Sequence, residues 1–242
     1  MKVIIPMAGL GKRFSDDGFD RPKPLIDING LPMIEKSIDS LSIEGDYIFI
    51  TRKTDFSSEI NSVLKSVKPN CMIKEIDYVT EGPATTCSLV RDELEPEENL
   101  VIANCDQIMW WSGKNFINFC NASDYDGVIV TYTSNTTKNS FAKLNKMGDV
   151  AEVKEKEVIS DISLNGIHFW KNSIDFINSY DTMVVNGDRA PNGEFYVGPS
   201  YNQMIKDGKR VGIHHIPNFQ HHPVGTPDDL REYIRNENLQ DR

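Results

Sequence analysis

The first half of the chain alternates short apolar runs with amphipathic stretches. The apolar runs are rich in valine and isoleucine, which is typical of strands buried on both faces, and the stretches between them repeat apolar residues at helical spacing. This alternation favours a parallel sheet with right-handed crossover helices. The predicted strands are 2–8, 46–51, 71–77 and 99–106, and the predicted helices are 32–41, 56–67 and 84–94.

The pattern changes in the second half, where shorter strand-like pieces are separated by charged turns. This change predicts a more antiparallel arrangement. The chain closes on a helix for which Thr226 is the expected N-cap, Pro227 the first helical residue and Asp229 the capping-box partner. The further predicted strands are 126–133, 141–145, 149–153, 163–169 and 210–216, and the further helices lie near 172–180, across 194–208 and in 225–239.

The chain of 242 residues contains no linker, low-complexity tract or hexapeptide repeat. We therefore predict a single Rossmann-like α/β domain, with a central mixed, mostly parallel sheet flanked by helices. Its nucleotide-binding half spans about 1–125 and its acceptor-binding half about 126–242. Ligands of such sheets gather at the carboxyl ends of the strands, so the loops beginning at Gly9, Thr51 and Asp106 are expected near one edge.

The composition of the chain limits which partners it is expected to bind. A formal net charge of −10 argues against nonspecific binding to nucleic acid or to an anionic membrane. No stretch of eighteen apolar residues occurs, and the N-terminal run is too short for a signal peptide, which predicts a cytoplasmic protein. The four cysteines are widely spaced and are expected to be reduced. Association into a homo-oligomer stays open.

A glycine turn follows the first predicted strand, in the stretch "PMAGLGKRF". A dinucleotide fingerprint would need a third glycine where Phe14 stands, and an acidic residue where the second strand ends in Arg52. A triphosphate P-loop would need a glycine in place of Pro6 and a serine or threonine in place of Arg13. Both familiar motifs are therefore excluded.

The turn still has the chemistry of a phosphate site. The strand stops before two glycines, which let an anion approach exposed backbone N–H groups. Arg13 can bind a phosphate bidentately, and Lys23 offers a point charge on a stretch stiffened by two prolines. The predicted phosphate site comprises Ala8, Gly9, Gly11, Lys12, Arg13 and Lys23.

Asp106 is the candidate metal ligand. It follows the apolar strand "NLVIAN", so its carboxylate is expected at the same edge of the sheet as the glycine turn. Mg²⁺ prefers oxygen ligands and commonly keeps waters and substrate phosphates, so one aspartate can suffice on the protein side.

Several stretches, taken in order, resemble one enzyme family. "GLGKR" followed by "RPKPL" is similar to the nucleotidylyltransferases that join a nucleoside triphosphate to a sugar 1-phosphate, to phosphocholine or to a related acceptor. "TEGPATTCSL" resembles their base-binding loop and "VIANCDQI" their metal-binding strand end. "EVKEK" and "GEFYV" resemble acceptor-binding segments, and "VGTPDDL" resembles the closing turn and helix.

The resemblance implies attack by the acceptor phosphate on the α-phosphorus of the nucleotide, with Mg²⁺ as cofactor and pyrophosphate as leaving group. It implies that Arg13 stabilises the pyrophosphate and that Lys23 stabilises the α-phosphate. The implied base-binding residues are Thr80, Glu81 and Gly82, and the implied acceptor-binding residues are Trp110, Lys143, Lys156 and Glu194.

Two departures from the family pattern bear on the substrates. Pro223 stands where sugar-nucleotide members often carry a second metal aspartate, and the base loop lacks the glutamine of the thymidylyltransferases. We expect a sugar 1-phosphate acceptor in the synthesis of surface polysaccharide precursors, with CTP favoured as the nucleotide.

Three other functions stay open. The first is a cytidylyltransferase for phosphocholine or a phosphorylated amino-acid amide. The second is a GT-A-type glycosyltransferase, although such enzymes usually hold manganese through an acid-x-acid pair and this chain has Asn104 in place of the first acid. The third is a nucleotide-binding protein without catalysis.

Overall fold

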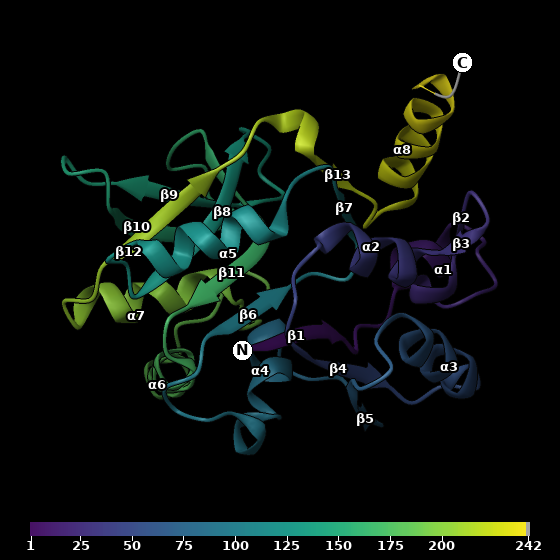
Figure 1. Cartoon of the computed structure of the whole chain (residues 1–242), viewed down its shortest axis with the longest axis horizontal. Helices are drawn as coiled ribbons and strands as arrows, with labels where there is room; N and C mark the ends of the chain where they lie inside the picture. Colours follow the sequence, from purple (N-terminus) through teal and green to yellow (C-terminus); the bar gives the residue numbers. More distant parts are fainter. Residues whose placement is uncertain (241–242) are drawn as a thin grey trace.

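The computed structural model describes residues 1–240 and has one nine-stranded sheet with helices on both faces (Figure 1). The strands of this sheet are β1 (Lys2–Met7), β4 (Asp46–Arg52), β5 (Met72–Ile76), β6 (Leu100–Ala103), β8 (Gly127–Thr133), β9 (Ser140–Leu144), β10 (Val150–Glu155), β11 (Ile162–Trp170) and β12 (Val211–His215). Seven of them follow the order β10-β9-β11-β6-β1-β4-β5, while β8 pairs with β11 and β12 pairs with β8. The mixed sheet confirms the predicted fold class.

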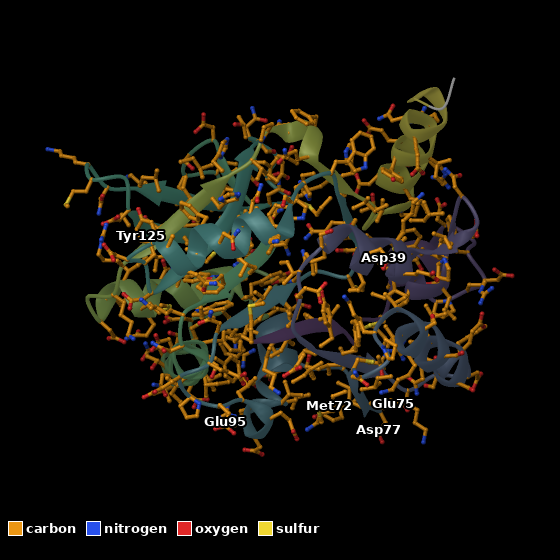
Figure 2. All side chains as sticks on the ribbon, in the orientation of Figure 1. Asp39, Met72, Glu75, Asp77, Glu95 and Tyr125 are labelled. Atoms are coloured by element: carbon orange, nitrogen blue, oxygen red, sulfur yellow. The ribbon has the colours of Figure 1, made fainter. Side chains whose placement is uncertain are left out.

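The two halves of the sheet differ in direction. In the first half, β1 pairs in parallel with both β4 and β6, and β4 pairs in parallel with β5. In the second half, β11 pairs antiparallel with β6, β8 and β9. The prediction of a more antiparallel second half is therefore confirmed. Figure 2 shows Met72 and Glu75 of the edge strand β5 at the lower margin of the molecule.

Helices cover the two faces of the sheet as separate layers. Alternate residues of β1 face opposite sides, so Val3 and Ile5 pack in one hydrophobic cluster while Ile4 packs in the other. The first cluster lies under α2 (Met33–Leu41), α3 (Ser57–Val67) and α5 (Gly113–Ala122), and the second under α4 (Pro83–Ser88), α6 (Ser173–Asn186) and α7 (Tyr201–Lys206). Burial on both faces explains why these strands are continuously apolar.

A third hydrophobic cluster joins the start of the chain to its end. Phe14 of the first helix packs there with Leu230 and Tyr233 of the last helix. The predicted cap of that last helix is confirmed, because the backbone N–H of Asp229 donates to Thr226 Oγ1 at 3.2 Å. The elements around this cluster are α1 (Lys12–Asp16), β2 (Asp27–Ile28), β3 (Leu31–Pro32), β7 (Gln107–Met109), β13 (His221–Pro223) and α8 (Pro227–Gln240).

Two helical regions differ from the predictions. The helix expected across 194–208 is short, because α7 starts only after the 3₁₀ turn η3 (Gly198–Ser200). Pro199 in that turn lacks the N–H that a longer helix would need. Helix α5 was not predicted. Among residues 1–240, no helix is both long and apolar enough to cross a bilayer.

Candidate functional site

A cavity of about 560 Å³ lies at the carboxyl ends of the parallel strands. The loops after β1, β4 and β6 line it, together with the start of α4. The turn before α8 closes one side through Gly225, and the second half of the chain contributes Glu194. The loops that begin at Gly9, Thr51 and Asp106 therefore meet, as the strand pattern predicts.

The glycine turn presents cations and backbone donors to this cavity. Gly11 adopts a left-handed conformation with φ of 63° and begins α1. Phe14 anchors that helix in the third cluster, which leaves Lys12 and Arg13 exposed on the cavity side. The N–H groups of residues 10–13 donate to no protein atom in the described part of the chain. Such a turn fits an anionic ligand.

Lys23 reaches the cavity from the short 3₁₀ helix η1 (Lys23–Leu25). Leu25 is buried in the first cluster and holds this segment in place. The ammonium group of Lys23 forms an ion pair with Asp106 and lies 5.9 Å from the ring centre of Phe14. Burial alone would lower the pKa of Lys23, but the Asp106 charge, the Cys105 thiol and the hydrogen bond to Asp106 together outweigh burial, so the pKa is raised.

Asp106 stands just beyond the end of β6 and lines the cavity. Burial would raise the pKa of its carboxyl group, but the charge and hydrogen bond of Lys23 lower it below its ordinary value. The turn before α8 lies beside Asp106, because the Val224 N–H donates to the Asp106 carbonyl at 2.9 Å. A Cβ on Gly225 would lie only 2.6 Å from Asp106 Oδ2. The Asp106 carboxylate therefore leaves no room for a side chain at position 225.

The donor set allows Mg²⁺ but offers it little from the protein. Among residues 1–240, no group of three or more His, Cys, Asp or Glu side chains converges as a metal cage. Asp106 supplies one carboxylate in a cavity that also has room for phosphates. Mg²⁺ is commonly held by one or two carboxylates and otherwise by water and substrate oxygens, so the residues present fit it.

The loop that the sequence predicts to bind the base, residues 80–82, is braced by hydrogen bonds within itself. The hydroxyl of Thr80 donates to the Gly82 carbonyl at 3.1 Å and lies 2.6 Å from the Thr86 hydroxyl. Thr80 and Gly82 line the cavity, whereas Glu81 points away and pairs with Arg189 at 2.9 Å. The Thr80 hydroxyl is therefore engaged in hydrogen bonds within the loop.

This loop also contacts the segment "GEFYV", which the sequence predicts to bind the acceptor. Phe195 N–H donates to the Glu81 carbonyl at 2.7 Å, and Ala84 N–H donates to the Phe195 carbonyl at 3.0 Å. Gly82 has φ of 121°, and a Cβ there would lie 2.5 Å from the Phe195 carbonyl oxygen. Only glycine fits this contact between the two halves of the chain.

The predicted acceptor residues are not all at the cavity. Glu194 lines it and accepts a hydrogen bond from Asn192 at 2.9 Å. Lys156 lies close by and donates to the Tyr196 hydroxyl at 2.9 Å, without lining the cavity. Two others lie elsewhere: Lys143 is exposed on β9, and Trp110 packs on the His222 ring with centroids 4.0 Å apart.

Three cavity residues at the end of β4 were not predicted as ligand contacts, namely Thr51, Arg52 and Thr54. In the sequence pattern, Arg52 counts only against a ribose-binding acid at the end of the second strand. The available signal was its position directly after the second parallel strand, where ligand contacts of such sheets are concentrated.

The glycine turn, the lysine–aspartate pair and the cavity at the strand ends together form a site suited to an anionic ligand. No family model matches the chain. A curated relative, the choline-phosphate cytidylyltransferase of Streptococcus pneumoniae (strain ATCC BAA-255 / R6), is 26% identical over 247 residues, which cover 99% of this chain and 98% of the relative.

Two solved structures share the fold. One is a nucleoside-diphosphate-sugar pyrophosphorylase from Vibrio cholerae RC9, with a TM-score of 0.84, 24% identity, and coverage of 96% of this chain and 99% of that one. The other, described as a glucose-1-phosphate thymidylyltransferase from Bacillus anthracis, has a TM-score of 0.78, 17% identity, and coverage of 98% and 94%. The chain therefore shares the fold of these two structures, and over nearly its whole length its sequence is similar to that of a nucleotidylyltransferase.

Proposed function

We propose that the protein transfers a cytidylyl group from CTP to a sugar 1-phosphate and releases pyrophosphate. The observation that carries this proposal is the convergence of Arg13, Lys23 and Asp106 on one cavity beside unpaired backbone N–H groups. A triphosphate needs such an arrangement, because its chemistry requires positioning and charge neutralisation far more than covalent help. The curated relative is named a cytidylyltransferase, which supports CTP.

In the proposed reaction an oxygen of the acceptor phosphate forms a bond to the α-phosphorus. The bond between the α-phosphorus and the bridging oxygen to the β-phosphate breaks, and pyrophosphate leaves with that oxygen. Gly9 and Gly11 let the triphosphate approach the turn, where Lys12 and Arg13 bind the departing phosphates. Lys23 stabilises the charge that develops on the α-phosphate.

Asp106 would hold Mg²⁺ through its carboxylate. When bound, the ion would neutralise phosphate charge and polarise the α-phosphate. Lys23 pairs with the same carboxylate, so its ammonium lies beside the group that would hold the ion.

We assign nucleotide binding to residues 1–125 and acceptor binding to residues 126–242. Ala8, Thr80 and the backbone of Gly82 would contact the nucleoside, and Glu81 would hold the loop through Arg189. Glu194 would bind the acceptor from inside the cavity. The more distant acceptor candidates, Lys143, Lys156 and Trp110, would need the acceptor to extend beyond it.

The proposed setting is the cytoplasmic synthesis of surface polysaccharide precursors. A second acceptor, phosphocholine, is favoured by the name of the curated relative and by the carboxylate of Glu194, which can attract a cationic head group. Purified protein would be incubated with Mg²⁺, each of the four NTPs, and sugar 1-phosphates or phosphocholine, while pyrophosphate is measured. Release with CTP and a sugar 1-phosphate is expected, and no release with any pair would refute the proposal.

The role of Lys23 has a matched control in Lys36. Both ammonium groups pair with a carboxylate, lie 5.9 and 5.5 Å from an aromatic centre, and have side chains 18% and 19% exposed. Lys36 lies outside the cavity. Lys23→Ala should lower kcat/KM at least about 100-fold while nucleotide still binds. Lys36→Ala should keep turnover near the native value, and equal losses in the two variants would contradict the assignment.

A further inference from the structure

Arg52 is a cation in the cavity without a protein partner. Its guanidinium makes no hydrogen bond or ion pair within residues 1–240, and its Nε is enclosed without an acceptor. The neighbouring Thr51 hydroxyl is buried and unpartnered as well. Enclosed polar groups are normally satisfied, so an orphaned guanidinium beside a cavity points to a ligand.

The position of Arg52 places it at the nucleoside end of the cavity. Strand β4 lies between β1 and β5, with Thr51 opposite Met7 and Arg52 opposite Ile76. Its end therefore lies between the glycine turn and the loop 77–82. Ile50 packs in the cluster under α4, and strand alternation turns Arg52 to the same face. That face carries the base loop.

Two exposed apolar side chains flank this end of the cavity. Leu10 of the glycine turn is 57% exposed and Val79 of the base loop is 54% exposed, and both line the cavity. They give this end of the cavity an exposed apolar surface. A flat base would cover this surface, and its edge would lie within reach of Arg52.

We propose that Arg52 reads the nucleobase and selects one with two adjacent hydrogen-bond acceptors on a single edge. The guanidinium carries only donors, held in a planar fork. Cytosine offers such an edge through O2 and N3, and guanine through O6 and N7. Uracil and thymine present N3–H beside each carbonyl, and adenine presents its amino group beside N1 or N7. The inference rests on the proposed function and names cytosine as the base.

The test compares nucleotide binding by Arg52→Gln and native protein, without acceptor, by titration calorimetry with CTP, UTP, GTP and ATP. Native protein should bind CTP most tightly. Glutamine offers one donor and one acceptor, which matches uracil, so CTP affinity should fall by about 5- to 150-fold while UTP affinity holds or rises. Lys53→Gln, in the next residue and exposed outside the cavity, should leave all four affinities unchanged.

Other outcomes have definite meanings. A uniform loss across the four nucleotides would place Arg52 on ribose or phosphate and overturn the proposal, as would no loss or a native preference for UTP or ATP. A GTP preference that disappears in the variant would keep the role of Arg52 and replace cytosine by guanine. Because no acceptor is used, absent turnover would refute the proposed function without deciding this test.

Arg52→Lys provides a second variant if the glutamine protein does not fold. Lysine keeps the charge but loses the fork, so base selectivity should be lost although the overall affinity for triphosphates is largely kept. Unchanged selectivity in a folded Arg52→Lys protein would overturn the proposal.

Discussion

Gly225→Ala should inactivate the enzyme while leaving it folded. The added Cβ would lie 2.6 Å from Asp106 Oδ2, 3.2 Å from its Cγ and 3.7 Å from the Lys23 ammonium. Ordinary contact begins at 3.4 Å, so the carboxylate would have to withdraw by about 0.8 Å. Gly225 has no left-handed φ, so alanine adds no backbone strain there. The effect should be confined to the lysine–aspartate pair.

Displacements of about 1 Å at reacting groups can cost about 100-fold in rate, so kcat/KM for pyrophosphate release should fall by about that factor. Overpacking of this kind costs about 1–3 kcal/mol, or a few degrees in Tm for a chain of this size. Thermal melts would be recorded beside the kinetics. Gly148→Ala is the control, because it adds backbone strain in open space remote from the cavity. Native activity in a folded Gly225→Ala protein would refute the role given to this contact.

Two further predictions concern stability. At Gly82, where φ is 121°, an alanine Cβ would clash with Phe195, so Gly82→Ala should lower the free energy of unfolding by about 2–6 kcal/mol. The control is Gly187→Ala, where φ is 66° and a Cβ would meet open space, and it should lower the free energy of unfolding by about 1 kcal/mol. Denaturant titrations of both variants would measure these losses. Burial lowers the pKa of His168 to about 3 in the folded protein, whereas the unfolded value is near 6.5. Below about pH 6.5 the unfolded chain binds a proton that the buried imidazole does not, so the free energy of unfolding falls as the pH drops. His168→Gln should remove up to about 1.4 kcal/mol per pH unit of the acid-side slope, and an unchanged slope would contradict this assignment.

The parallel half of the fold could be predicted because each element there has a strong local signal. Strands β1, β4 and β6 are apolar on both faces. The bounds of β1 and β4 lie within one residue of the predicted ranges, and β6 lies inside its predicted range but ends three residues earlier. Helix α5 gave no such signal. Its sequence "GKNFINFCNA" is rich in residues of low helix propensity, and Phe116 and Cys120 are buried one turn apart only because the sheet covers them.

The three-residue strands β7 and β13 were missed for a different reason. They pair only with each other, from Met109 opposite His221 to Gln107 opposite Pro223, across more than a hundred residues. Strands this short have no periodicity of their own, and their pairing depends on where the last turn docks. That docking also brings Gly225 to Asp106. The sequence pattern predicts the turn that contains Gly225, but only the folded structure shows that this turn contacts Asp106.

The same limit applies to the site. Lys23 and Asp106 could be paired in advance, because one follows the glycine turn and the other follows a parallel strand, and strand ends share an edge. Arg52 satisfies the same rule but stands next to Lys53, another cation, and the sequence cannot tell which one points inward. Strand alternation turns Arg52 to the face of the base loop and leaves Lys53 exposed.

The charge pairing also bears on how one carboxylate could serve the proposed reaction. Burial alone would favour a protonated Asp106, which could not bind a cation. The charge and hydrogen bond of Lys23 oppose the effect of burial and keep the pKa of the carboxyl group low, so Asp106 stays ionised at neutral pH. Entry of a triphosphate with Mg²⁺ would give each partner a new opposite charge, the ion for Asp106 and the α-phosphate for Lys23. Neither charge would then be left unpaired, because the exchange replaces one ion pair by two.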